Sequence, residues 1–196
     1  MPRKPQKRSE ATRATLLRVA RELFADRGYS AVTAEDIVSA AELTRGALHH
    51  QFGDKRGLFR ELLLVVEAEL VAEIRAAVSA QQGPPEQMVA AMNVFLDACT
   101  RPEVSRIALL DAPVVLGWTQ WRAIEADYGL QVIIELLEAG MDAGFIQRQP
   151  APPLAQIILS ALIESALLIA HADDKPATRA TVSHALGLLL SGLLTP

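Results

Sequence analysis

Four basic side chains lie within eleven residues of the chain: Arg45, His49, His50 and Lys55. An arginine at the first turn of a helix can donate two parallel hydrogen bonds to a guanine edge. The alternative is an arginine that meets a phosphate or only solvent. Gly46 and Ala47 are small, so a helix that carries them can lie close to a groove floor, where Ala47 can touch a thymine methyl group. These residues predict a surface that meets double-stranded DNA.

Two helix starts with the same pattern surround these donors. Thr33 and Thr44 are preferred N-cap residues, because a threonine hydroxyl accepts a hydrogen bond from an unpaired amide of the first turn. Asp36 stands where the reciprocal partner of a capping box is expected. The two starts are eleven residues apart, which leaves about two helical turns and a short bend. The spacing predicts a helix-turn-helix, with Glu42 and Leu43 in a bend that usually favours glycine.

Phosphate contacts are predicted at the helix starts. The hydroxyls of Thr33 and Thr44 are candidates, and so is Lys55, which follows the predicted cap Asp54. An ammonium group beside the unpaired amides of a first turn makes a cationic helix start that suits a phosphate. We expect His50 to face the DNA. Two apolar residues of the same helix are expected to face the core instead: Leu48 and Phe52.

The charge of the chain is divided unevenly along its length. Residues 1–60 carry a balance of +5 and residues 61–196 a balance of −9, although the net charge is only −4. A basic head on an acidic body is expected when only the head meets a polyanion. Residues 1–8 are predicted to be disordered. Their cations either follow the DNA or form a solvated tail, and we favour the tail: Arg3, Lys4, Lys7 and Arg8.

Composition narrows the class of protein. Hydrophobic residues make up 51% of the 196 residues, which is enough for a sizeable core. No uninterrupted apolar run reaches the roughly 18 residues of a membrane span, and the basic start has no apolar segment behind it. The single cysteine, Cys99, cannot form an internal disulfide. We therefore expect a cytoplasmic protein.

Helical periodicity covers almost the whole chain, and no stretch alternates like a strand. The predicted fold is all-α with about nine helices, in which a three-helix head with the helix-turn-helix precedes a C-terminal helical bundle. The predicted domains are residues 1–53, for DNA, and 54–196. Apart from the two short helices of the helix-turn-helix, the expected helices are 9–26, 54–80, 86–100, 103–110, 119–143, 153–172 and 176–194, with a kinked connection over 111–118.

The last two predicted helices, 153–172 and 176–194, are apolar around more of their circumference than one core face needs. Small residues such as Ala161, Ser165 and Gly187 allow helices to approach closely. Pairing with the same helices of a second chain would give a symmetric four-helix interface, and hence a homodimer. The alternative is burial within one chain.

These residues and their order resemble the TetR/AcrR family of bacterial transcriptional regulators. The resemblance is specific over about residues 10–65, around the segment LLRVARELFADRGYSAVTAEDIVSAAELTRGALHHQFGDKRGLF. In this chain Glu42 replaces the usual turn glycine, His49 stands where tyrosine is usual, and Gln51 stands where histidine is common. A histidine is shorter than the tyrosine that often contacts a phosphate.

The resemblance implies a homodimeric, ligand-responsive regulator without a cofactor. It implies a repressor that leaves a palindromic operator when a small apolar or amphipathic molecule binds. It also implies a pocket among the C-terminal helices, for which five residues are candidates: Met92, Phe95, Cys99, Trp118 and Trp121. Plain core is the alternative role for these five. Asp111 and Glu164 are candidates to meet a cationic or hydroxylated ligand, or are ordinary surface groups.

Two other classes of protein were weighed against a DNA-binding regulator. A small helical enzyme is not expected, because the chain has no phosphate-binding glycine loop and no nucleophile elbow. The group most like a metal site is His171 and His184 with Asp173 and Asp174, but such residues are common where helices are linked, so no metal is expected. A helical adaptor that binds only protein would explain the body of the chain but not its basic head.

Overall fold

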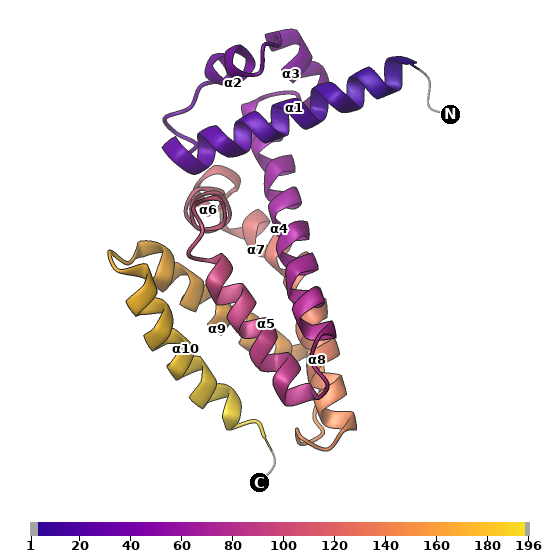
Figure 1. Cartoon of the computed structure of the whole chain (residues 1–196), viewed down its shortest axis with the longest axis vertical. Coiled ribbons are helices and arrows are strands. Elements are labelled where there is room, and N and C mark those ends of the chain that lie inside the picture. Colours follow the sequence, from indigo (N-terminus) through magenta and orange to yellow (C-terminus); the bar gives the residue numbers. More distant parts are fainter. Residues whose placement is uncertain (1–3, 195–196) are drawn as a thin grey trace. The chain divides into compact units, whose positions relative to one another are not determined.

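The structure, a computed structural model, describes residues 4–194, with side chains from residue 8 onward. Within that range the chain forms nine continuous helical stretches and no strand, which confirms the predicted all-α fold (Figure 1). The elements are α1 (Lys4–Arg27), α2 (Ala34–Ala40), α3 (Arg45–Phe52), α4 (Lys55–Ser79), α5 (Pro84–Ala98), η1 (Glu103–Asp111) continued by α6 (Ala112–Leu116), α7 (Trp118–Glu125) continued by η2 (Ala126–Leu130) and α8 (Gln131–Asp142), α9 (Ala151–His171) and α10 (Lys175–Ser191). The segments η1 and η2 are π-helical.

Two segments that were predicted to be irregular are helical. Residues 4–8 belong to α1, whereas residues 1–3 of the predicted disordered tail lie outside the described residues. Pro5 does not prevent this start, because the first turn of a helix needs no amide donor there. The predicted kinked connection over 111–118 contains α6, and Pro113 again occupies its first turn.

The chain folds into two compact units. The first consists of the residues up to Val66 together with Pro102–Trp118, and the second of Glu67–Arg101 and the residues from Thr119 onward. This division differs from the predicted domain boundary at residue 53, because it falls inside α4. The first turns of α4 bury Leu58 and Phe59 in the first unit, so a helix boundary is not a boundary between cores here.

The core of the first unit is aromatic at its centre. The Phe59 ring lies 5.5 Å from the Phe24 ring and 5.0 Å from the Tyr29 ring, both in edge-to-face arrangement. The α1 helix ends at Arg27, and the next residue, Gly28, has a φ of +78°, which glycine adopts at little cost. The segment that follows is held by η1, because Asp111 accepts a hydrogen bond of 2.7 Å from the Tyr29 amide.

The two caps predicted in the helix-turn-helix are present. The Thr33 hydroxyl accepts from the Asp36 amide at 3.1 Å, and the Asp36 carboxylate accepts from the Thr33 amide at 2.8 Å, so the capping box is complete. The Thr44 hydroxyl accepts from the Ala47 amide at 3.2 Å. Both short helices therefore begin where the sequence indicated, and their starts are satisfied by side chains.

Glu42 adopts the backbone conformation of the glycine it replaces. Its φ is +54°, the one positive φ of a non-glycine residue in the described part of the chain. The Leu43 amide donates to the Val38 carbonyl and the Glu42 amide to the Ser39 carbonyl, which is the Schellman pattern at the end of α2. The bend is therefore fixed by backbone hydrogen bonds, and the backbone of Glu42 is strained because a β-carbon disfavours this conformation.

We expect Glu42→Gly to stabilise the chain by about 0.5–1 kcal/mol, because relief of the left-handed strain exceeds the entropy that glycine adds to the unfolded state. Glu42→Val should destabilise it, since a β-branched residue tolerates this conformation least. Thermal or urea unfolding measures both. The control is Glu35→Gly inside α2, which should cost about 1 kcal/mol. Equal losses for Glu42→Gly and Glu35→Gly would contradict the strain at position 42.

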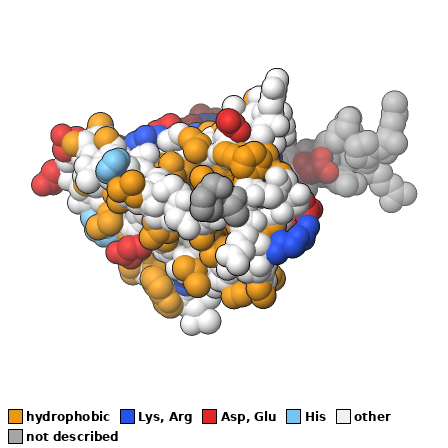
Figure 2. Space-filling model, turned by 90° about the horizontal axis from the view of Figure 1, so that it is seen from below, with side chains coloured by type: hydrophobic (Ala, Val, Ile, Leu, Met, Phe, Trp, Pro, Cys, Tyr) orange, Lys and Arg blue, Asp and Glu red, His pale blue; other side chains and the backbone are white. Residues whose placement is uncertain are grey.

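The second unit packs α8 and α9 against each other. Its core cluster consists of Leu137, Met141, Ile146, Ala151, Ala155 and Ile158. The helices run close to their predicted bounds, and η2 widens the predicted helix 119–143 without breaking it. Several large apolar side chains of α9 and α10 remain outside this core, among them Ile157 at 66% and Leu188 at 63% exposed. Apolar side chains also recur on the face drawn in Figure 2.

Helix α9 corrects one expectation from composition. Its 21 residues contain an 18-residue window with a mean hydropathy of 1.9, so it has the length and composition of a membrane span. The apolar sequence of α9 is interrupted by three polar residues: Gln156, Ser160 and Glu164. The mean hydropathy of the window nevertheless stays in the range of a membrane span. Within the structure 44% of that window is buried, and core helices of soluble proteins pass the same test.

Candidate nucleic-acid interface and ligand pocket

Helix α3 is held in the first unit by its inner side. Leu48 is buried, as predicted, and Gln51 donates to the Ser9 hydroxyl of α1 at 2.8 Å. Phe52 is half-buried, with the Arg13 guanidinium 4.8 Å from its ring centre. These contacts fix the rotation of α3 and so determine which of its side chains face outward.

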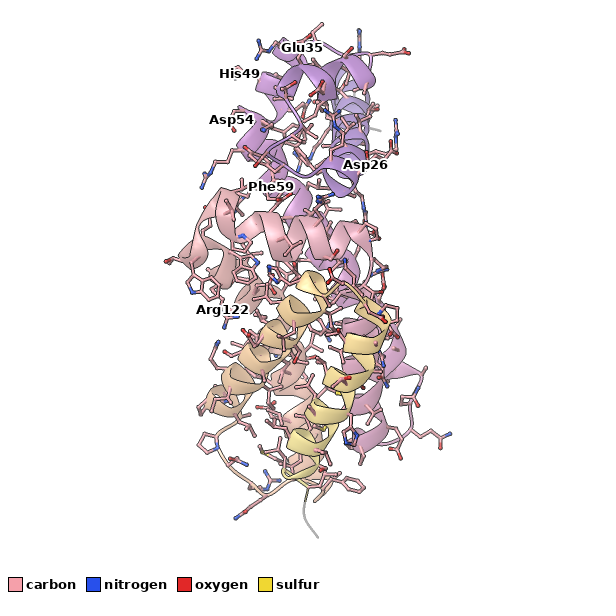
Figure 3. All side chains as sticks on the ribbon, turned by 90° about the vertical axis from the view of Figure 1, so that its left-hand side faces the viewer. Asp26, Glu35, His49, Asp54, Phe59 and Arg122 are labelled. Carbon is pink, nitrogen blue, oxygen red and sulfur yellow. The ribbon has the colours of Figure 1, made fainter. Side chains whose placement is uncertain are left out.

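The outer side of α3 carries the predicted base-reading residues. Arg45 is 75% exposed, and its nearest charged partner is Glu35 of α2, at 3.7 Å. Gly46 and His50 are exposed and Ala47 is half-buried. A β-carbon at Gly46 would meet only the Thr44 hydroxyl, at 3.7 Å, so nothing inside this unit requires glycine there. Figure 3 shows Glu35 and His49 near one edge of this unit.

His49 uses one ring nitrogen within the chain. Its Nδ1–H donates to the Gly53 carbonyl, which also fixes the tautomer of the neutral ring. The remaining nitrogen, Nε2, is then an acceptor in the neutral ring and a donor only in the imidazolium. A phosphate contact by His49 therefore requires a charged ring, unlike the tyrosine that is usual in the resembled family.

Two of the predicted phosphate contacts are engaged inside the chain. Lys55 Nζ donates to the carbonyls of Tyr29 at 3.0 Å and Val32 at 2.8 Å, and lies 3.8 Å from the centre of the Tyr29 ring. Partial burial lowers the pKa of Lys55, and the nearby Asp111 carboxylate opposes this. The Thr33 hydroxyl donates to Asp36, and these Thr33 hydrogen bonds lower the pKa of that carboxyl.

One hollow on the first unit brings three of the predicted residues together. Its lining is Ala34, Arg45, Leu48, His49, Gly53, Asp54 and Lys55. Thr44 lies one residue before this lining, and accepting from Ala47 leaves its O–H available to a phosphate. Lys55 and Thr33 instead stabilise the loop and the cap that place α2 and α3.

We expect Lys55→Met to lower the free energy of unfolding by about 1–3 kcal/mol, because two loop carbonyls lose their donor. The change should leave the salt dependence of DNA binding nearly unchanged, since the ammonium is directed inward. Denaturant melts and binding curves at several salt concentrations measure the two effects. A normal melt with a salt slope reduced by about one unit would instead place Lys55 on a phosphate.

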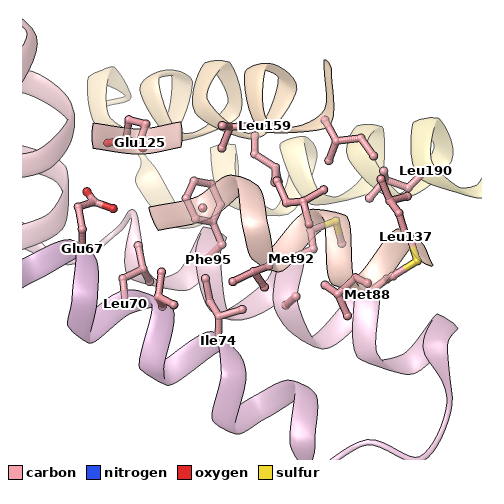
Figure 4. Close-up of a pocket in the computed structure, with 18 residues that line it drawn as sticks. Glu67, Leu70, Ile74, Met88, Met92, Phe95, Glu125, Leu137, Leu159 and Leu190 are labelled. Carbon is pink, nitrogen blue, oxygen red and sulfur yellow. The ribbon is translucent and has the colours of Figure 1, made fainter. Parts of the chain in front are cut away.

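The second unit contains a pocket with a largely apolar wall. Its empty space measures about 820 Å³ when the open solvent at its mouth is included. The lining residues are Glu67, Leu70, Val71, Ile74, Met88, Ala91, Met92, Phe95, Glu125, Gly129, Val132, Ile133, Leu136, Leu137, Ile158, Leu159, Leu162 and Leu190 (Figure 4). This largely apolar wall suits a small apolar molecule.

Two of the five predicted pocket residues line it: Met92 and Phe95. Cys99 is buried outside the lining, where its thiol donates to the Phe95 carbonyl and burial raises its pKa. Trp121 is fully buried core, and Trp118 belongs to the first unit and is 60% exposed. The proposed polar contacts lie elsewhere too, since Asp111 binds the Tyr29 amide and Glu164 is exposed.

The polar groups of the pocket are Glu67 and Glu125, which the sequence analysis missed. Both are buried, at 5% and 6% exposure, and their carboxyl groups are hydrogen-bonded to each other. Burial, together with the neighbouring Glu125 carboxylate, raises the pKa of Glu67 well above its usual range. Burial raises the pKa of Glu125 to about 7. Their signal in the sequence is an acid at an apolar position, as at Glu67 between Leu63 and Leu70.

No metal site competes for these groups. Within residues 4–194 no three His, Cys, Asp or Glu side chains gather as metal ligands. His171, part of the group most like a metal site in the sequence, bonds through Nδ1 to the Leu167 carbonyl of its own helix.

Known proteins share both parts of this architecture. The family model for the tetracyclin repressor-like C-terminal domain matches residues 85–193, and the model for bacterial regulatory proteins of the tetR family matches residues 16–62. The chain therefore belongs to the TetR family of bacterial regulatory proteins.

Particular relatives show how far the similarity extends. A TetR-family transcriptional regulator from Pectobacterium atrosepticum is 33% identical, with a TM-score of 0.89 over 100% of this chain and 99% of that one. The HTH-type transcriptional repressor Rv1474c of Mycobacterium tuberculosis is 32% identical over 123 residues, which span 61% of this chain and 63% of the relative. The ketosteroid transcriptional regulator KstR2 of M. tuberculosis shares the fold, with a TM-score of 0.63 at 22% identity over 94% and 95% of the two chains.

The raised pKa of Glu125 sets a pH dependence of stability. A carboxyl whose pKa is higher in the folded than in the unfolded chain contributes stability below its unfolded pKa, and this is lost as pH rises through about 7. We expect the free energy of unfolding, and with it the melting temperature, to fall between pH 5 and pH 8. Glu125→Gln should reduce the fall in free energy by an amount on the order of 3 kcal/mol. Scanning calorimetry across this range measures it. The control Glu164→Gln, at an exposed acid, should show the same pH dependence of the melting temperature as the unmodified chain. A melting temperature of the unmodified chain that does not change with pH would refute the effect.

Proposed function

We propose that the chain is a cytoplasmic transcriptional repressor that binds a palindromic operator as a homodimer and leaves it when a small apolar or amphipathic molecule binds. The observation that carries this proposal is the difference between the two faces of α3. Leu48 and Gln51 pack its inner face against the first unit, while its outer face is exposed. A helix fixed from behind and lined in front by Arg45 and small residues suits the major groove.

The proposed DNA contacts divide into base reading, phosphate contact and positioning. Arg45, Gly46, Ala47 and His50 are assigned to the base edges. Thr44 and charged His49 are assigned to phosphates. Thr33 and Lys55 are assigned to placing α2 and α3, because their donors are engaged inside the chain. In functional terms residues 1–53 meet DNA, and residues 54–196 bind the ligand and pair the chains.

The proposed dimer pairs α9 and α10 with the same helices of a second chain. Support comes from the large apolar side chains left exposed there: Ile157, Leu168, Leu188 and Leu189. Nothing lies within 4 Å of a β-carbon built at Gly187 of α10, so a partner helix could approach closely at that point. A two-fold dimer would present two recognition helices to major grooves roughly 34 Å apart, which matches a palindromic site.

Helix α4 is the proposed connection between ligand and DNA. It supplies Leu58 and Phe59 to the core of the first unit, and Leu70 and Ile74 to the pocket of the second. A ligand that binds better to one placement of α4 would favour dimers in which the recognition helices no longer match the operator. A tenfold preference shifts operator affinity by about 1.4 kcal/mol, and operator DNA must lower ligand affinity by the same factor.

We expect Arg45→Ala to weaken operator binding by about 1–3 kcal/mol and binding to random DNA much less, because a base contact is lost. Footprinting of the DNA upstream of the chain's own gene identifies the operator, and titrations with operator and random duplexes measure the loss. Arg148→Ala is the matched control, since Arg148 has the same residue type, similar exposure and a carboxylate partner, Asp142, at 2.8 Å in the second unit.

Two results would overturn the proposal. Equal losses on operator and random DNA would move Arg45 to a phosphate. Sedimentation that finds a monomer both at micromolar concentration and on DNA would remove the dimer and with it the palindromic site.

A further inference from the structure

The two carboxyl groups of the pocket lie at one end of it. Figure 4 shows Glu67 and Glu125 together at that end, and Met88, Leu137 and Leu190 toward the other. The two acids come from different helices, α4 and α7, and both are more than nine-tenths buried. The wall is therefore apolar along most of its length and acidic at one place.

One oxygen of this pair has no partner. Oε1 of Glu125 is buried without a hydrogen bond, although Glu67 and Trp121 both bond to the Glu125 carboxylate. A buried polar atom left unpaired costs roughly 1–3 kcal/mol, and the cost is larger for a charged group. A donor that arrives with a ligand is one way to satisfy such an atom, since Glu125 lines the pocket.

Among the residues whose side chains the structure describes, no cation neutralises the pair at close range. Arg122, one turn before the end of α7, acts on Glu125 at longer range and donates to the Ser160 hydroxyl at 3.2 Å. Cys99, the C-cap residue of α5, is also influenced by the two acids, but it is a thiol and brings no positive charge. Two buried acids without a cation between them must share a proton or receive a cation from outside.

We propose that the pocket binds an amphipathic amine, whose protonated nitrogen is held by Glu67 and Glu125 and whose apolar body lies along α5, α8 and α9. This inference names the ligand class of the proposed function and rests on it for the consequence at the operator. An ammonium offers several donors to two carboxylates, Oε1 of Glu125 included. An acidic ligand would be repelled there, and a neutral one would leave the acids without a cation.

The test compares three probes that share one alkyl chain: decylamine, decan-1-ol and decanoate. Calorimetry on the full-length protein without DNA should give the amine about tenfold higher affinity than the alcohol, and the carboxylate the lowest. Glu125→Gln and Glu67→Gln should each remove most of the preference for the amine and leave the affinity for the alcohol within about twofold. Glu164→Gln, which removes an exposed acid of α9, should change nothing.

Equal affinities for amine and alcohol, or an amine preference that survives both substitutions, would overturn the proposal. Melting curves of each variant verify the fold, and the two glutamine variants should melt no lower than the unmodified chain above pH 7. This experiment contains no operator. An amine that binds as expected but leaves operator DNA in place in a gel shift would therefore refute ligand release while the ligand class stands.

Discussion

Helix α4 contributes side chains to two hydrophobic cores while its backbone hydrogen bonds continue without a break. From Lys55 to Ser79 it contains no proline, and its one glycine, Gly57, lies in the first turn. A β-carbon at Gly57 would lie 2.1 Å from the Phe52 carbonyl, so the close approach of α3 and α4 depends on this residue. A continuous helix cannot rotate its two ends independently, because each residue's rotation about the axis is fixed relative to the next.

The start of that helix shows how a cation can act through structure. The Lys55 ammonium donates hydrogen bonds to two loop carbonyls and makes a cation–π contact with the Tyr29 ring. These contacts order the loop between α1 and α2 from its inner side. That loop ends at Thr33, the cap of α2, and α2 in turn is followed by the strained bend at Glu42. Helix α3 is thus placed by a series of local hydrogen bonds, and Arg45 and His50 remain exposed on its outer side.

Short-range sequence signals made the first unit predictable. Caps at Thr33 and Thr44, the stop at Gly28 and the apolar position of Leu48 each depend on residues a few places away, and each was placed correctly. The pocket was less predictable because its members are distant in sequence. Glu67 and Glu125 are on separate helices, and nothing near either residue indicates the other. Trp118 and Trp121 have the same residue type and opposite exposure, which only tertiary packing decides.

The ion pair between Arg45 and Glu35 has a kinetic consequence. At 3.7 Å, with both side chains mostly exposed, it contributes at most about 1 kcal/mol. In the proposed complex Arg45 turns to DNA and leaves behind a carboxylate that repels the phosphates. On random sequence a guanine edge is seldom in register with Arg45, so that exchange is seldom compensated and we expect encounters there to be shorter, by at most about fivefold. The weak pairing of Arg45 with Glu35 would in this way speed the search for the operator along the chromosome. Removal of Glu35 would then slow the movement between sites and change the affinity of the operator complex little.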